Sequence, residues 1–288
     1  PSYTLGISPC PNDTYIFEAL IHGRVRAPFT VRTHTADVEE LNAAAADARL
    51  DITKLSMAAV PGILEQYIVL NAGGALGRGC GPLLAARPGL AESEYPGARI
   101  AVPGFRTTAN LLLTLHGAFR GPRGAVRFDA VMPALLEGRA DLGLIIHEGR
   151  FTYAQKGLRL VLDLGEWWEK EKGLPLPLGV IVVRRSLGME VAAAVQAAVR
   201  LSLAHAEAHP EDGREFIRSS AQEMDPEVMA GHIALFVNEY SKDLGSDGQE
   251  AVTALLRAGA GEFGIALPDL PVFVDDDDAV RNRTRNFR

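Results

Sequence analysis

The sequence has few cysteines and no long apolar run, and these absences exclude several classes of protein. Among 288 residues there are 2 cysteines, Cys10 and Cys80. They are too few and too far apart for a disulfide framework or a CxxC site, so we expect reduced thiols, with a disulfide between them as the alternative. No apolar stretch approaches the ~18–20 residues of a membrane-spanning helix. The first residues, PSYTLGISPCPND, have neither the basic start nor the apolar core of a secretion leader, so we expect a cytoplasmic protein.

Basic charge is scarce as well. The chain has 29 Lys and Arg against 36 Asp and Glu, a formal net charge of −7, and no long basic cluster. This balance disfavours nucleic acid or an anionic membrane as a partner, although single Arg and Lys side chains remain able to bind a small anion. A hydrophobic content of 47% over 288 residues is sufficient for the cores of two domains.

Strand and helix signals alternate along the first part of the chain, which predicts an α/β fold. Strands are expected at Tyr3–Ser8, Phe29–Thr35 and Asp51–Leu55, with helices at Tyr15–His22 and from about residue 37 to 48 between them. The third strand would place Lys54 and Ser56 at its carboxyl end, and Ser56 could cap a short helix that continues to about Leu64.

A glycine-rich segment, GGALGRGCGPL, follows the strand expected at Tyr67–Leu70. It has neither the GK[ST] ending of a Walker loop nor a GxGxxG that opens a helix, and it continues into the strand-like segment Pro82–Arg87. We therefore expect close backbone approach or a turn here, with phosphate binding as the alternative.

A second βα region begins after a linker rich in proline, glycine and glutamate at Arg87–Gly97. A strand is expected at Arg99–Val102, and Thr107 or Thr108 would cap the helix at Ala109–Gly117. The free N–H groups and positive dipole of that helix end could bind a carboxylate; the alternative is an ordinary cap without a ligand. A further strand is expected at Val126–Asp129.

The stretch Asp141–Tyr153, DLGLIIHEGRFTY, carries the best candidate for chemistry. Its apolar run Leu142–Ile146 is typical of a strand covered on both faces, and His147 follows at the carboxyl end, where ligand crevices form in open α/β sheets. We favour a functional role for His147 over that of a histidine that only bonds to backbone at a strand end.

The apolar, proline-containing segment LPLPLGVIVV after residue 173 could cross back to the first region, and only helices are expected beyond it. We therefore predict two lobes: residues 1–97 with 181–288, which form the larger lobe, and residues 98–180, which form the smaller. The charged residues 275–288 are predicted to be a mobile tail.

Other catalytic patterns are weak. His205 and His209 lie one helical turn apart but lack the HExxH order and an evident third ligand, so a solvated helix face is favoured over zinc. There is no GxSxG elbow. Cys10 could have a lowered pKa beside a helix start, or it could simply be buried.

Six separated motifs, in order, closely resemble the 1,4-dihydroxy-6-naphthoate synthase family of the futalosine route to menaquinone. They are SPCPNDTYIFEALIHGRV, TKLSMAA, GGALGRGCGPL, AVPG with TTAN, LIIHEGRFTYAQKGL and LPLGVIVVRR. The resemblance implies a two-lobed, periplasmic-binding-protein-like fold of type II with the substrate in the cleft. It also implies a lyase that releases the naphthoate from cyclic dehypoxanthinylfutalosine without a metal or other cofactor.

The resemblance also implies site residues. The family's general base corresponds to His147, and its substrate contacts correspond to Lys54, Leu55, Ser56, Thr108 and Ala109. We add Thr107 as the helix cap. Weaker candidates for positioning a small carboxylate substrate are Asn12, Asp13, Asn42, Arg78 and Arg150.

Two other functions remain open at this point. A solute-binding protein could use the same cleft to capture a carboxylate, with His147 as a hydrogen-bond partner only. A catalytic relative could act on another step of the same pathway, since similar folds support different chemistry.

Overall fold

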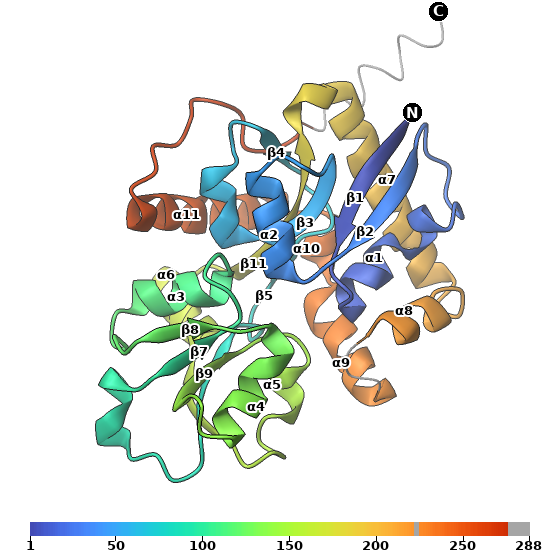
Figure 1. Cartoon of the computed structure of the whole chain (residues 1–288). Helices are drawn as coiled ribbons and strands as arrows, with labels where there is room; N and C mark the ends of the chain where they lie inside the picture. The colour runs from blue at the N-terminus through green and yellow to red at the C-terminus, as the bar shows by residue number, and fades with distance from the viewer. Residues whose placement is uncertain (222–224, 276–288) are drawn as a thin grey trace, which may run out of the picture.

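The computed structural model describes residues 1–221 and 225–275 and contains two β-sheets, each with its own helices (Figure 1). The first sheet has the strand order β2-β1-β3-β11-β4, and β5 also pairs with β11. Its strands are β1 (Ser2–Ile7), β2 (Thr30–Thr35), β3 (Ile52–Ser56), β4 (Tyr67–Val69), β5 (Ala75–Gly77) and β11 (Leu176–Arg184).

The second sheet has the order β10-β6-β9-β7-β8. Its strands are β6 (Leu83–Ala86), β7 (Ile100–Val102), β8 (Arg123–Ala125), β9 (Leu142–Ile145) and β10 (Arg159–Asp163). Both sheets contain parallel and antiparallel pairs. In the first, β1 runs parallel to β2 and β3, while β11 runs antiparallel to β3. In the second, β7 runs parallel to β8 and β9, while β6 runs antiparallel to β9.

Helices cover both sheets. Around the first sheet lie α1 (Pro11–Ile21), α2 (Val38–Ala46), the 3₁₀ helix η1 (Met57–Gly62), η4 (Arg185–Leu187), α7 (Met189–Ala208), α8 (Arg214–Ser220), α9 (Pro226–Phe236), α10 (Glu239–Lys242) and α11 (Gly245–Phe263). With the second sheet come η2 (Glu92–Gly97), α3 (Thr108–His116), η3 (Phe128–Ala130), α4 (Val131–Leu136), α5 (Gly149–Thr152) and α6 (Leu164–Lys172). In the described part of the chain, no helix is long and apolar enough to cross a bilayer.

The sheet pairing corrects the predicted lobe boundaries. β6 pairs with β9 of the second sheet, although residues 1–97 were assigned to the first lobe. The chain returns to the first sheet at β11, which begins at Leu176 rather than near residue 181. The linker Arg87–Gly97 therefore lies within the second lobe. A short apolar strand looks the same in either sheet, so its partner could not be read from the local sequence.

Two further expectations need correction or lie outside the described residues. The strand predicted at Val126–Asp129 is wrong: β8 lies at Arg123–Ala125, and η3 follows at Phe128–Ala130. The Arg-Gly-Ala sequence of β8 carries little strand signal, because this edge strand is largely exposed. The tail predicted at 275–288 falls, after Asp275, outside the described residues.

One buried apolar cluster is continuous between the two sheets. It includes Leu55 and Val180 of the first sheet, Val102 and Leu144 of the second, and Trp168 of α6, each at most 1% exposed. Full burial of such a side chain stabilises a fold by about 1.5–3 kcal/mol. This shared core holds the ends of β3 and β9 in a defined relation, and the pocket described next lies between them.

Candidate active site

A pocket enclosing about 720 Å³ of space, part of it open to solvent, lies where β3, β9 and the start of α3 meet. Its lining residues are Ser8, Asn12, Asp13, Val38, Lys54, Leu55, Ser56, Ala75, Cys80, Gly81, Pro82, Thr107, Thr108, Ala109, Ile146, His147, Arg150, Leu178, Gly179, His232 and Phe236. The structure thus brings together the predicted site residues with the exception of Asn42, which lies behind the wall, and Arg78, which lies at the surface.

His147 follows β9 at its carboxyl end, with its backbone in the left-handed region at a φ of 54°. A residue with a Cβ adopts this conformation at a cost of about 1–2 kcal/mol, and such strain is frequent at functional sites. Its Nδ1 lies 3.4 Å from Cys10 Sγ, at the N-cap of α1. Its Nε2 is buried and has no hydrogen-bond partner among residues 1–221 and 225–275.

The surroundings of His147 keep its imidazole neutral. Burial lowers the pKa of His147 to about 4, with the Asp13 carboxylate acting in the opposite direction and the Lys54 ammonium adding to the decrease. The Phe128 ring packs edge-on against the imidazole at a centroid distance of 4.9 Å. A neutral ring in this position has a lone pair available to accept a proton.

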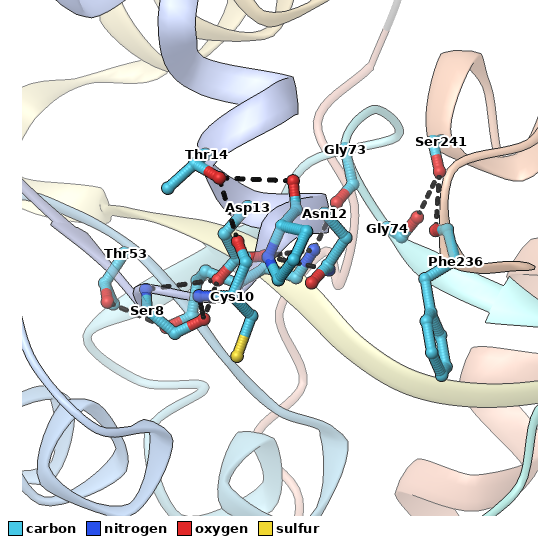
Figure 2. A network of polar contacts seen from close by, with 12 residues as sticks. Ser8, Cys10, Asn12, Asp13, Thr14, Thr53, Gly73, Gly74, Phe236 and Ser241 are labelled. Atoms are coloured by element: carbon cyan, nitrogen blue, oxygen red, sulfur yellow. Dashed lines mark hydrogen bonds and ion pairs between the residues drawn. The ribbon is translucent and has the colours of Figure 1, made fainter. Parts of the chain in front are cut away.

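Asp13 is the centre of a buried polar network at the start of α1 (Figure 2). Its Oδ2 accepts hydrogen bonds from Ser8 N and Ser8 Oγ, at 3.1 and 2.7 Å. Its Oδ1 accepts from Asn12 Nδ2 at 3.1 Å and lies 3.4 Å from Lys54 Nζ. The Lys54 ammonium also donates to the Gly73 carbonyl at 2.7 Å. With these donors around it, Asp13 holds the positions of Lys54 and Asn12.

Ser56, at the end of β3, has its backbone and side chain fixed by Asn42. Ser56 N donates to Asn42 Oδ1 at 2.9 Å, and Asn42 Nδ2 donates to Ser56 Oγ at 3.1 Å. Because the Ser56 oxygen accepts that bond, its own hydrogen is directed elsewhere, and the residue lines the pocket. Asn42 is fully buried and therefore supports Ser56 from behind.

The amino end of α3 faces the same pocket. Of the two residues predicted as the cap, Thr107 is the N-cap, and its Oγ1 accepts from Asn110 N at 3.3 Å. The N–H groups of Thr108 and Ala109 belong to the first turn, which has no intrahelical acceptor for them. The Thr108 hydroxyl is already engaged, since it donates to the Leu178 carbonyl at 2.6 Å. Only the backbone of this residue is therefore available to a ligand.

The glycine-rich segment forms part of the opposite wall through Cys80 and Gly81. A Cβ on Gly81 would lie 2.2 Å from Gly165 Cα, so glycine is required by close backbone approach. The Gly81 carbonyl accepts a bond from Arg150, whose Nη2 also lies 2.8 Å from Asp163 Oδ2. Arg150 is thus held at the wall, while Arg78 lies at the surface and donates to the Gly173 carbonyl.

Sequence reasoning missed several residues of the wall, among them the two that α9 contributes. His232 and Phe236 come from α9, far along the chain, and their rings are 4.5 Å apart. His232 is fully buried, stacks beside His147 at 6.1 Å between ring centroids, and places its Nε2 3.0 Å from Asn12 Oδ1. No local motif marks a histidine in the middle of an apolar helix as part of a pocket.

Both cysteines are free and buried, which agrees with the expectation of reduced thiols. Burial is the main reason that the pKa of Cys10 lies well above its ordinary value, and it raises the pKa of Cys80 to about 12. The alternative of a reactive, low-pKa Cys10 is therefore wrong. Cys10, His147 and Glu148 bring potential ligand atoms within 4.8 Å of one another, but the Cys10–His147 distance is also that of a hydrogen bond, and we assign no metal role to them.

Comparison with known proteins identifies the family of this chain. A family model described as menaquinone biosynthesis matches residues 3–261. The chain belongs to this family. A 1,4-dihydroxy-6-naphthoate synthase from Thermus thermophilus is 49% identical over 271 residues, which cover 94% of this chain and 98% of that protein. A protein of the same name from Streptomyces coelicolor is 44% identical over 90% of this chain and 93% of its own length.

Solved structures confirm the predicted fold class. A crystal structure of a protein from Archaeoglobus fulgidus is 34% identical, covers 92% of this chain and 98% of its own, and has a TM-score of 0.85. The periplasmic aliphatic sulphonate binding protein of Escherichia coli, at 11% identity, superposes with a TM-score of 0.63 over 91% of this chain and 86% of its own. This menaquinone biosynthesis protein therefore has the two-lobed architecture of periplasmic binding proteins.

Proposed function

We propose that this chain is a lyase that converts cyclic dehypoxanthinylfutalosine into 1,4-dihydroxy-6-naphthoate, with His147 as the general base. The supporting observation is a pocket in which a neutral imidazole with an unpartnered Nε2 lies together with groups able to bind a carboxylate. The names of the two curated relatives support the same activity.

The carboxylate of the substrate would bind between Ser56 and the first turn of α3. The Ser56 hydroxyl and the N–H groups of Thr108 and Ala109 can donate to an anion, and the helix dipole favours negative charge at this end. Leu55 contributes the apolar wall beside them, and the buried Lys54 adds a positive charge nearby.

The His147 imidazole would then take a proton from the sugar-derived part of the substrate. Elimination of that part leaves the new ring aromatic, which drives the step forward. The Asp13 carboxylate favours the imidazolium that forms, while Lys54 opposes it. Proton transfer by a positioned base typically contributes about 10²–10⁴-fold to a rate. None of these steps requires a metal or a redox cofactor.

The test is to incubate protein dialysed against EDTA with cyclic dehypoxanthinylfutalosine and to look for the naphthoate by mass spectrometry. We expect conversion, and expect it to be unchanged when Mg²⁺ or Zn²⁺ is omitted. Binding without conversion would favour the solute-binding alternative. Conversion that appears only after metal is added would contradict the cofactor-independent mechanism.

A further inference from the structure

His232 lines the pocket from α9, and its neighbours determine which of its two ring nitrogens carries the hydrogen. Its Nε2 lies 3.0 Å from Asn12 Oδ1. Its Nδ1 is buried and has no hydrogen-bond partner within the described ranges, 1–221 and 225–275. The tautomer of the ring therefore decides whether Nδ1 is a donor or an acceptor.

The orientation of Asn12 is determined by Asp13. The Asp13 carboxylate is surrounded by donors: the backbone and hydroxyl of Ser8, and the ammonium of Lys54. An ionised carboxylate can only accept, so Asn12 must turn its NH₂ group towards Asp13, where the distance is 3.1 Å. This leaves the Asn12 carbonyl oxygen facing His232.

The same reasoning applies to the imidazole of His232. A carbonyl oxygen can only accept, so His232 Nε2 must carry the hydrogen and donate to Asn12. Burial, with the neighbouring His147 adding to it, lowers the pKa of His232 well below its ordinary value. A neutral imidazole carries a single N–H, and Nδ1 is therefore an acceptor with a free lone pair.

A buried acceptor without a donor costs free energy unless a ligand or a water molecule supplies the missing hydrogen. His232 is fully buried at the pocket wall, and its ring centroid lies 6.1 Å from that of His147. A group of the substrate close to the His147 imidazole is therefore within the neighbourhood of His232 as well.

We propose that His232 is a specificity-determining residue whose Nδ1 accepts a hydrogen bond from a hydroxyl group on the sugar-derived part of the substrate. This inference rests on the proposed function. In that reaction the carboxylate end of the substrate lies at Ser56 and α3, and the part that loses a proton lies at His147. The hydroxyl-bearing, sugar-derived part is the part beside His232. An acceptor at this position favours a hydroxyl and disfavours a carbonyl or carboxylate oxygen, because neither carries a hydrogen.

Two amide substitutions distinguish the roles of the two ring nitrogens of His232. His232→Gln can keep a donor near the position of Nε2, and so the bond to Asn12, but it has no acceptor at the position of Nδ1. His232→Asn places an amide oxygen near the position of Nδ1 but is too short to reach Asn12. We expect His232→Gln to lower kcat/KM for cyclic dehypoxanthinylfutalosine by about 10–100-fold, with the melting temperature close to that of the parent protein. His232→Asn should recover part of this loss.

The naphthoate product provides the control for a merely structural role, because it lacks the sugar-derived part. Its dissociation constant, measured by calorimetry, should be the same for the parent protein and His232→Gln. Equal weakening of substrate and product would overturn the inference, as would an unchanged kcat/KM.

The failure of this inference differs from failure of the proposed function. If the parent protein does not convert cyclic dehypoxanthinylfutalosine, the proposed function is wrong. If the parent protein converts it and His232→Gln converts it equally well, only the role of His232 is wrong. Nitrogen-15 NMR of histidine-labelled, ligand-free protein tests the tautomer independently: we expect Nε2 protonated and Nδ1 unprotonated, and a protonated Nδ1 would overturn the inference.

Discussion

Cys10 Sγ and His147 Nδ1 lie 3.4 Å apart although 137 residues separate them in the sequence. The sulfur of Cys10 points away from the network around Asp13, as Figure 2 shows. For Nε2 of His147 to act as a base, Nδ1 must carry the hydrogen and direct it to the Cys10 sulfur. The contact between these two residues therefore orients the proposed base, and the Cys10 sulfur can accept the Nδ1 hydrogen that the basic tautomer requires.

Replacing Cys10 should affect catalysis more than binding. Cys10→Ala removes the atom that orients His147, and we expect kcat to fall by about 10-fold, within the range that second-layer partners of an imidazole contribute in other sites. Cys10→Ser keeps a polar atom and should retain more activity. The measurement is kcat with its pH profile, and a change in KM alone would contradict this role.

His147→Asn tests the base directly. Asparagine is polar and tolerates a positive φ better than most residues, so it suits the backbone at 54°. It cannot accept the proton, and we expect turnover to fall by about 10²–10⁴-fold while product binding survives. Thermal unfolding must show a folded variant. Near-normal turnover in a folded variant that binds the substrate would remove His147 as the essential base.

The lowered pKa of His147 predicts how activity and stability change at acidic pH. Activity needs the neutral imidazole, so kcat/KM should remain level below pH 6.5 and decline only as the pH approaches about 4. The effect on stability follows from the same shift. As the pH falls from 6.5, His147 binds a proton in the unfolded chain before it does so in the folded chain. The stability gained from the neutral ring is complete above about pH 6.5 and is lost as the pH falls towards 4. Melting temperature against pH checks this, and a rise on acidification would contradict it.

Ser56→Ala should weaken substrate binding without changing the chemical step. A hydrogen bond to a charged group contributes about 1.5–3 kcal/mol, so we expect KM to rise by roughly 10–150-fold with kcat nearly unchanged. Ser219→Ala is a matched control, because Ser219 is exposed on α8 and donates to the Phe216 carbonyl. An equal effect of the two substitutions would show that Ser56 does not bind the carboxylate.

Thr108 offers a test of backbone against side chain. Its hydroxyl donates to the Leu178 carbonyl, and Thr108→Ser keeps that bond whereas Thr108→Val loses it. We expect the valine variant to lose about 1–3 kcal/mol of unfolding free energy and to keep its kcat, since the backbone N–H remains. Denaturant unfolding measures the first quantity. A stable valine variant without activity would mean that the hydroxyl itself contacts the substrate.

Local sequence signals were sufficient for the ends of β3 and β9 and for the start of α3. Ser56 and His147 follow short apolar runs, and Thr107 is an N-cap residue before a helix, so each could be placed at an edge where ligands bind. These signals are local because a strand or a cap is specified by the residues within it. They also predicted an α/β fold, whereas the periplasmic-binding-protein-like class came from the family resemblance.

The partners of these elements were decided only by the tertiary structure. β6 pairs with β9 instead of joining the first sheet, and His232 reaches Asn12 across 220 residues of sequence. Apolar residues on α9 look the same whether the helix covers a core or a pocket, and a histidine among them has no distinguishing neighbours. Which atoms of Cys10, Asn12, His147 and His232 face one another depends on how separate elements pack, since packing satisfies buried polar groups through contacts that are distant in sequence.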